Sequence, residues 1–395
     1  MSLHVHCSST ECVIMAVFME IKKRAQTALL ILGRPESESL PLDISMTAAS
    51  LEMKTAEDSV RIGLPSGLRI IPSSCRGVQY IPGDGLHLRL QVQAYCSTKL
   101  LPTLKESLKG EKSYVFHCQS CGAVIMKERN FLRVLPLPSE NWNTLVEEWC
   151  CHADPFANKV LRPRDNDCFV GDTYILVNCK NEALSQEVPH ICSSNSKNHS
   201  PPQNSEEHAA VVCQRCKATF GERLSPDTMK YYITEIMIQP PCKDITMLPR
   251  SCYVESVTAQ LLAEFSSARS TFRFIFEGHD GKVYLLLWLL NSDTLLVETA
   301  GHVVSGNIFR LPEDRSRPNS SSLMLRNALK VLFHACTKNR NEELVRAWRN
   351  DTGVHSLTFP SHTCLELLLL LSSSNRSLPA SLRCMNAFQV AFLKM

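Results

Sequence analysis

The sequence lacks the long apolar runs of membrane proteins and any marked excess of charge of one sign. Apolar runs such as 283–290 and 367–371 are far shorter than the roughly 20 residues that a membrane-spanning helix needs. The 42 Lys and Arg residues are nearly balanced by 39 Asp and Glu residues, which leaves a net charge of +3. A charge this small argues against a broad nucleic-acid-binding surface. We therefore expect no membrane partner and no direct nucleic-acid partner.

The N-terminus lacks the charge order of a secretory signal. Its apolar run, 13–19, is followed rather than preceded by the basic residues Lys22, Lys23 and Arg24. We expect a protein that is not secreted and that resides in the cytoplasm, with the nucleus as a second compartment. In such reducing surroundings the 18 cysteines predict metal ligands, reactive thiols or buried side chains, and no disulfide framework. Zinc is the first hypothesis.

Several familiar catalytic motifs are also absent. The sequence contains no Gly-x-Ser-x-Gly elbow, phosphate-binding loop, Gly-rich dinucleotide turn or His-Glu-x-x-His helix. These absences remove the main support for hydrolytic and nucleotide-driven chemistry. We expect no nucleotide and no organic cofactor.

Patterning along the chain predicts an α+β protein in three units. The first, 17–97, is a β-rich N-terminal domain, because short apolar segments are separated by turns and residues 86–92 alternate between apolar and polar. The second, 113–222, holds two Cys pairs and a polar stretch, 193–208, whose composition is typical of a flexible insertion. The third, 228–395, has mixed α+β character. Its expected strands and helices cover 271–276, 282–290, 251–267, 339–349 and 363–372.

Two Cys-x-x-Cys pairs give the strongest chemical signal in the chain. They are Cys118 with Cys121 and Cys213 with Cys216. Two residues between thiols let one tight turn direct both sulfurs at a metal ion, and two such turns complete the tetrahedral shell that zinc prefers. Four thiolates leave no open coordination position, so the predicted zinc site is structural. The alternative is that these are buried or unrelated thiols.

A second group of soft ligands lies between the two pairs. Cys150, Cys151, His152 and Asp154 are clustered within five residues, and adjacent cysteines in an extended chain point to opposite sides. A second zinc site here would need ligands from elsewhere, such as Cys168 or His190. A packed segment without function is the alternative.

Cys364 stands at the start of the helix expected near the C-terminus. The positive end of a helix dipole lowers the pKa of a thiol there and favours the thiolate. His362 lies two residues earlier and is a candidate to assist. The alternative is an ordinary core cysteine, because Cys364 also begins an apolar helix.

Five segments carry a likeness to a known family: 28–33, 72–77, 135–142, 266–274 and 289–293. Through these segments the whole chain resembles the HECT-like ubiquitin-protein ligases of the ubiquitin-conjugating-enzyme-binding type. The resemblance implies that the protein accepts ubiquitin from a conjugating enzyme, in particular the one that serves the anaphase-promoting complex. It further implies transfer to substrate lysines and proteasomal degradation, with cyclin B as a candidate client.

The same resemblance bears on the catalytic residue. HECT ligases hold their thioester cysteine in the pattern Leu-Pro-x-x-x-Thr-Cys-Phe-Asn-x-Leu, and residues 359–368 look similar to it. Cys364 is then the candidate thioester acceptor, within a HECT-like segment at about 357–395, although Leu365 and Glu366 replace Phe-Asn. Phe392 matches the phenylalanine that HECT ligases tend to carry fourth from the C-terminus. We therefore expect a HECT-like ubiquitin-protein transferase.

The segment 149–152 carries a second resemblance, which implies a different function. It is similar to a Cys-bearing segment by which certain inhibitory chaperones plug the two-zinc site of metallo-β-lactamase-fold RNA endonucleases, such as the pre-mRNA 3′-end-processing endonuclease of the cleavage and polyadenylation machinery. There a thiolate displaces the metal-bridging water. This resemblance makes Cys151 the first choice for a ligand to the partner's zinc and Cys150 the second. The alternative function is thus a non-catalytic endonuclease inhibitor.

Overall fold

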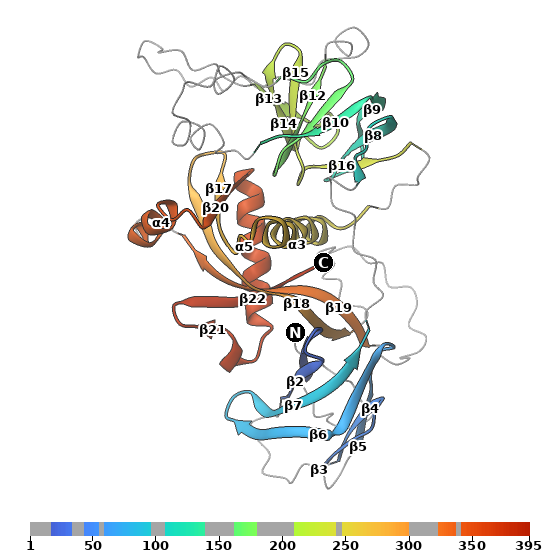
Figure 1. The fold of residues 1–395 in the computed structure, drawn as a ribbon, viewed down its shortest axis with the longest axis vertical. Coiled ribbons are helices and arrows are strands. Elements are labelled where there is room, and N and C mark those ends of the chain that lie inside the picture. Colours follow the sequence, from blue (N-terminus) through green and yellow to red (C-terminus); the bar gives the residue numbers. More distant parts are fainter. Residues whose placement is uncertain are drawn as a thin grey trace.

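The computed structural model describes nine stretches of the chain, which together form a strand-rich protein with three α-helices (Figure 1). The described residues are 17–33, 43–54, 59–95, 107–138, 162–179, 209–241, 247–299, 323–336 and 341–395. None of the helices within them has both the length and the apolar character needed to cross a membrane.

The largest sheet has ten strands and draws on both ends of the described chain. Eight follow one another in the order β21 (Cys384–Met385), β22 (Phe388–Lys394), β19 (Leu323–Ala335), β18 (Val283–Thr299), β1 (Val17–Lys22), β2 (Thr27–Leu32), β7 (Gly85–Ala94) and β6 (Leu68–Ile81). Two more lie off this path, because β17 (Arg273–Gly278) pairs with β18 and with β20 (Val354–Phe359).

Strand β18 connects the N-terminal strands to the C-terminal ones. Its first half pairs with β17, and its second half pairs with β1 through the register Glu20↔Leu296. Register shifts between Leu289 and Thr294 separate the two halves. An ion pair crosses the same region, since Lys330 Nζ lies 2.8 Å from an oxygen of the buried Glu20. The expected first and third units therefore share one sheet, while the boundaries proposed for the three units stay a prediction.

The remaining strands form three smaller sheets. A six-stranded sheet has the order β10 (Arg133–Pro136), β11 (Asp167–Val170), β12 (Tyr174–Asn178), β15 (Thr228–Tyr232), β14 (Thr219–Ser225) and β13 (Ala209–Val212). The three-stranded sheets are β16 (Ile236–Gln239), β8 (Lys112–Cys118) and β9 (Val124–Phe131), and β3 (Asp43–Met46), β4 (Ser50–Lys54) and β5 (Ser59–Gly63).

Three helices complete the described structure, with a short 3₁₀ turn near the C-terminus. They are α3 (Arg250–Arg269), α4 (Glu342–Arg349) and α5 (Ser361–Arg376), and the turn is η1 (Ala380–Leu382). These bounds confirm the helices expected at 251–267 and 363–372, and the helix expected at 339–349 is confirmed from Glu342 onward among the described residues. In Figure 1, α3 and α5 lie between the small sheets that carry β8 to β16 and the central part of the large sheet.

The apolar run 283–290 is covered on both faces of β18 only as far as Leu286, because Trp288 and Leu290 on the outer face are 42% and 41% exposed. Leu287 and Leu289 face the main core, which also contains residues of α3 and α5. Leu286 faces the opposite side and packs with Trp348 of α4. A strand that is covered on both faces reads as a continuous apolar run and not as an alternating one. The first turn of α5 packs against this sheet, at strand β17.

Candidate metal centre and the first turn of α5

The two Cys-x-x-Cys pairs come together in space, although about 90 residues separate them in the sequence. The sulfur of Cys118 lies 3.6 Å from that of Cys216, and the sulfur of Cys121 lies 3.7 Å from that of Cys213. All four sulfurs lie within 4.8 Å of one another. A tetrahedral zinc ion with Zn–S bonds of about 2.3 Å needs sulfurs about 3.8 Å apart. The four cysteines therefore fit a closed metal site.

The two pairs form because each ends a strand in the same tight turn. In the first, the backbone N–H of Gly122 donates to Cys118 O, and in the second the N–H of Lys217 donates to Cys213 O, both at 2.8 Å. Gly122 and Lys217 both adopt positive φ angles, of 73° and 63°. Glycine adopts such angles without strain, whereas lysine does so at a cost that the turn must offset. The two turns have near-identical hydrogen bonding, as their shared spacing predicts.

The pKa values of the thiols at Cys118, Cys121 and Cys213 bear on the protons that a metal ion would have to displace on binding. Burial raises the pKa of the Cys118 thiol to about 12 and also raises the pKa of Cys121. The pKa of Cys213 is lowered, because the backbone N–H groups of Cys216 and Arg215 outweigh the effect of its own burial. Zinc binds thiolates, so binding must release protons and must weaken as the pH falls.

The other cysteines singled out from the sequence do not extend this cluster. Cys150, Cys151 and His190 lie outside the described residues. Cys168 is fully buried on β11, and burial raises its pKa to about 12. We call each Cys-x-x-Cys turn a knuckle, the first with Cys118 and Cys121 and the second with Cys213 and Cys216. Within the part of the chain that the structure describes, these four knuckle cysteines are the only group of three or more metal-ligand residues close enough to share an ion.

Cys364 lies in the first turn of α5 with its thiol directed into the core. The residue is fully buried, and its sulfur lies 3.5 Å from the backbone oxygen of Glu277 on β17. Burial, with a further contribution from Asp280, raises the pKa of the thiol to about 12. In this conformation the helix dipole does not yield a thiolate, because desolvation dominates. The helix start expected from the sequence is present, but the side chain faces away from solvent.

Phe392 is also buried. Phe392 belongs to β22 and packs against the ring of Phe18 on β1. Lys330 Nζ lies 5.4 Å from the centre of the Phe392 ring. The phenylalanine matched to the HECT pattern is therefore part of the core in this conformation.

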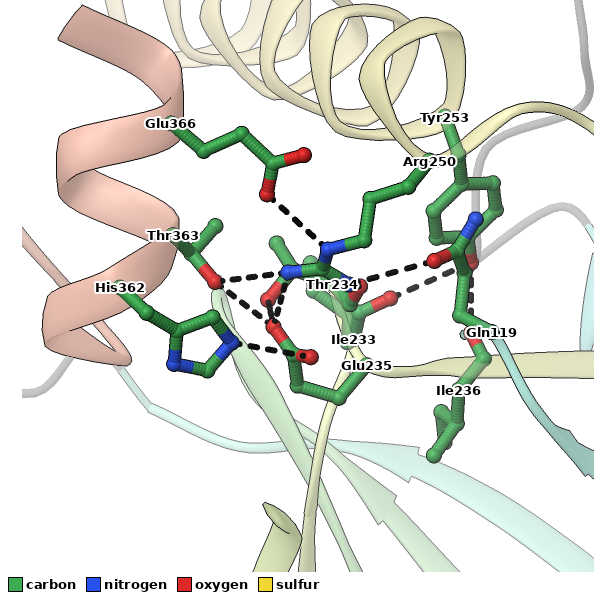
Figure 2. A network of polar contacts seen from close by, with 10 residues as sticks. All are labelled: Gln119, Ile233, Thr234, Glu235, Ile236, Arg250, Tyr253, His362, Thr363 and Glu366. Carbon is green, nitrogen blue, oxygen red and sulfur yellow. Dashed lines mark hydrogen bonds and ion pairs between the residues drawn. The ribbon is translucent and has the colours of Figure 1, made fainter. Parts of the chain in front are cut away.

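A buried polar network holds the first turn of α5 against the metal-site side of the molecule (Figure 2). At its centre, Arg250 at the start of α3 uses every nitrogen of its guanidinium group as a hydrogen-bond donor. Its acceptors, at 2.8–3.2 Å, are the backbone oxygen of Thr234 and side-chain oxygens of Gln119, Glu235, Thr363 and Glu366. Such charge-assisted, multidentate contacts are stronger and more directional than neutral hydrogen bonds.

Glu235 is the anionic partner of this network and lies in the turn between β15 and β16. Its carboxylate is almost fully buried and accepts hydrogen bonds from Arg250 and from the hydroxyl of Thr363, at 2.8 and 2.7 Å. Its second oxygen lies 3.3 Å from His362 Nε2. Burial alone would raise the pKa of Glu235, but the contacts with His362 and Arg250 lower it to about 2. The carboxylate is therefore ionised at neutral pH.

The sequence pattern did not reveal this network, apart from His362. Glu235 and Arg250 belong to no recognised motif, and the motifs that contain Gln119 and Thr363, the first Cys-x-x-Cys pair and the HECT-like Thr-Cys pattern, do not indicate that these two side chains meet. One local signal was present: Glu235 is a single acidic residue inside the apolar stretch 231–238. A lone charge in a run that reads as buried predicts a buried partner, but it does not say which residue supplies it.

The fold and the site define a strand-rich protein with a four-cysteine cluster that could hold a metal ion. The chain belongs to the family of HECT-like ubiquitin-conjugating enzyme (E2)-binding proteins, which matches it over residues 20–390. The resemblance inferred from the sequence is thereby confirmed.

Relatives with assigned names match nearly the whole chain. The chain is 51% identical over 386 residues to a Bos taurus protein named as an E3 ubiquitin-protein ligase, covering 96% of this chain and 98% of that protein. Proteins of the same name from Homo sapiens and Mus musculus are 51% and 52% identical over the same two shares of chain length. No solved structure matches the chain.

The metal site gives the first testable expectation. Purified full-length protein should contain one tightly bound zinc ion per chain, measured by elemental mass spectrometry. The Cys213→Ser variant should lose the metal and the stability of the region around the two Cys-x-x-Cys turns, because zinc binding contributes free energy to the folding of the segments that it joins. The exposed Cys384 lies outside the cluster, so Cys384→Ser should keep the metal. Full metal retention by Cys213→Ser would contradict the site.

The low pKa of Glu235 gives a pH-dependent expectation. Because the folded pKa of about 2 lies below the ordinary value of 4.5, the stabilisation is complete above about pH 4.5 and is lost as the pH falls through about 2. The difference in unfolding free energy between wild type and Glu235→Gln should therefore shrink by about 3 kcal/mol across that window. Denaturant titrations at several pH values measure it.

Proposed function

We propose that this protein is a ubiquitin-protein ligase that binds a ubiquitin-conjugating enzyme and promotes transfer of ubiquitin to substrate lysines. One observation carries the proposal: the match to an E2-binding family over residues 20–390, joined by 51% identity to relatives named as ubiquitin-protein ligases. The match covers the metal centre, the Arg250 network and α5. The function thus belongs to the whole described fold and not to an isolated motif.

Cys364 is the thiol that we propose as the ubiquitin acceptor. Its thiolate would attack the carbonyl carbon of the thioester that joins ubiquitin to the cysteine of the conjugating enzyme, and that cysteine would leave as a thiolate. The neutral amine of a substrate lysine would then attack the carbonyl carbon of the new thioester, form an amide bond and lose a proton to solvent, and Cys364 would leave as a thiolate. Both steps conserve charge and need no oxidant or cofactor, but the first requires a deprotonated and accessible sulfur.

The described conformation is the closed, resting state of this acceptor. Cys364 is fully buried, and burial raises the pKa of its thiol to about 12, so the thiol stays protonated at neutral pH. A bulky thioester cannot reach a side chain in such a position. Transfer therefore requires the first turn of α5 to move away from β17, which would also restore the contribution of the helix dipole to the thiolate.

The finer assignments rest on resemblance. The conjugating enzyme that serves the anaphase-promoting complex, cyclin B as a client and proteasomal degradation of the product are parts of this proposal for which the described contacts give no further argument. The endonuclease-inhibitor alternative depends on Cys151 and Cys150, which lie outside the described residues. That alternative stays a prediction.

The acceptor role is tested with a conjugating enzyme charged with ubiquitin. Wild-type protein should form a ubiquitin adduct that a reducing agent removes, visible on non-reducing gels, and Cys364→Ala should form none. Cys336→Ala is a control, because Cys336 is a partly buried thiol whose pKa is also raised, to about 11, by burial. If Cys364→Ala builds ubiquitin chains at the wild-type rate, the conjugating enzyme transfers directly and this protein acts as a scaffold.

A further inference from the structure

Gln119 connects the metal centre to the Arg250 network. It stands between the two cysteines of the first knuckle, Cys118 and Cys121, and its side chain is almost fully buried. Its side-chain oxygen accepts a hydrogen bond from Arg250 at 3.2 Å, and its backbone N–H donates to the backbone oxygen of Glu235 at 3.0 Å. A metal ion that holds this knuckle in place would therefore also hold Gln119, and with it one side of the Arg250 network.

Thr363 connects the other end of the network to the acceptor cysteine. Its hydroxyl donates to Glu235 at 2.7 Å and accepts from Arg250 at 3.0 Å, and the residue is fully buried directly before Cys364. Glu366, one turn further along α5, accepts from the same guanidinium group at 2.9 Å. As Figure 2 shows, His362, Thr363 and Glu366 all point from α5 toward Glu235 and Arg250, so the first turn of α5 is held by contacts to both members of the ion pair.

The energetics of buried charge make this network respond as a unit. A buried ion pair with all its hydrogen bonds satisfied is stable, but removal of one partner leaves an uncompensated charge in a region of low dielectric. The network therefore keeps its closed geometry or opens as a whole. The two knuckles meet at their four sulfur atoms and where Arg215 donates to the backbone oxygen of Cys121, so loss of the metal would loosen the first knuckle and the Gln119 side chain that Arg250 contacts. The backbone bond from Gln119 to Glu235 continues the pairing of β8 with β16 and is held by that pairing as well.

We propose that metal occupancy of the four-cysteine site controls whether the Cys364 thiol is buried or exposed, through Gln119, Glu235, Arg250 and Thr363. With the metal bound, the network holds the first turn of α5 closed over β17. Without it, this turn opens and the thiol reaches solvent. We call this metal-dependent closing of the first turn of α5 the latch. Its biological meaning rests on the proposed acceptor role, but exposure of the thiol is measurable without ubiquitin or a conjugating enzyme.

The first experiment measures the rate at which N-ethylmaleimide alkylates Cys364 in the folded full-length chain, with peptides quantified by mass spectrometry. Removal of zinc with a chelator should raise this rate about tenfold or more, because a lost buried contact to a charged group shifts a local opening equilibrium by at least that factor. Cys336, at the end of β19 and away from α5, reports general unfolding and should change far less. An unchanged Cys364 rate, or equal increases at both cysteines, would overturn the proposal.

A matched pair of variants tests the same latch with the metal still bound. Thr363→Val keeps the shape of the side chain but removes the hydroxyl, whereas Thr363→Ser keeps the hydroxyl. Thr363→Val should raise the alkylation rate of Cys364 at full zinc content, and chelation should then add less than it does in the wild type, because both changes open one network. Thr363→Ser should behave as the wild type does.

Gln119→Ala supplies an independent test at the opposite end of the network. It removes the side-chain contact to Arg250 but none of the four sulfurs, so zinc content should be kept while alkylation of Cys364 rises. If Thr363→Val and Gln119→Ala both leave the rate at the wild-type value, no latch connects the two sites. Failure of the ubiquitin-adduct experiment together with success here would remove the acceptor role and leave the latch.

Discussion

The ion pair between Arg250 and Glu235 is the interaction on which the arrangement of this protein depends. Arg250 begins α3, and Glu235 lies in the turn that leads from the six-stranded sheet to the strand beside the first metal knuckle. Through these two residues the knuckle, α3 and α5 meet at one point (Figure 2). Three segments with few local reasons to associate are thereby held in a fixed relation.

A pair of this kind, with a buried carboxylate and a half-buried guanidinium group, is costly to form unless its geometry is good, and it therefore favours one arrangement. Desolvation of a guanidinium and a carboxylate must be offset by close contacts, and the described geometry provides them at every nitrogen of Arg250. The result is a junction that favours one arrangement of its parts and loses much of its stability when one member moves. The same property accounts for a closed thiol at Cys364 and for its proposed release.

Features set by residues close together in the sequence could be predicted from it, whereas most features set by residues far apart in the sequence could not. Cys-x-x-Cys spacing predicts each knuckle and their joint site, since metal geometry leaves few choices. Apolar spacing likewise predicts α3 and α5. The pairing of β1 with β18 joins residues up to 276 positions apart, and the contacts of Arg250 span up to 131 positions. At Cys364, the sequence predicts the helix start but not the direction of the thiol, because that direction is set by packing against β17.

Hydrogen–deuterium exchange on the Arg250→Met variant tests the junction most directly. Methionine fills similar space but offers no donor, so Glu235 is left without its cation. If the pair joins the metal centre to α5, backbone amides in the first knuckle, 118–123, and in the first turn of α5, 361–366, should both exchange faster than in the wild type. Faster exchange confined to the start of α3, with both other segments unchanged, would contradict the account.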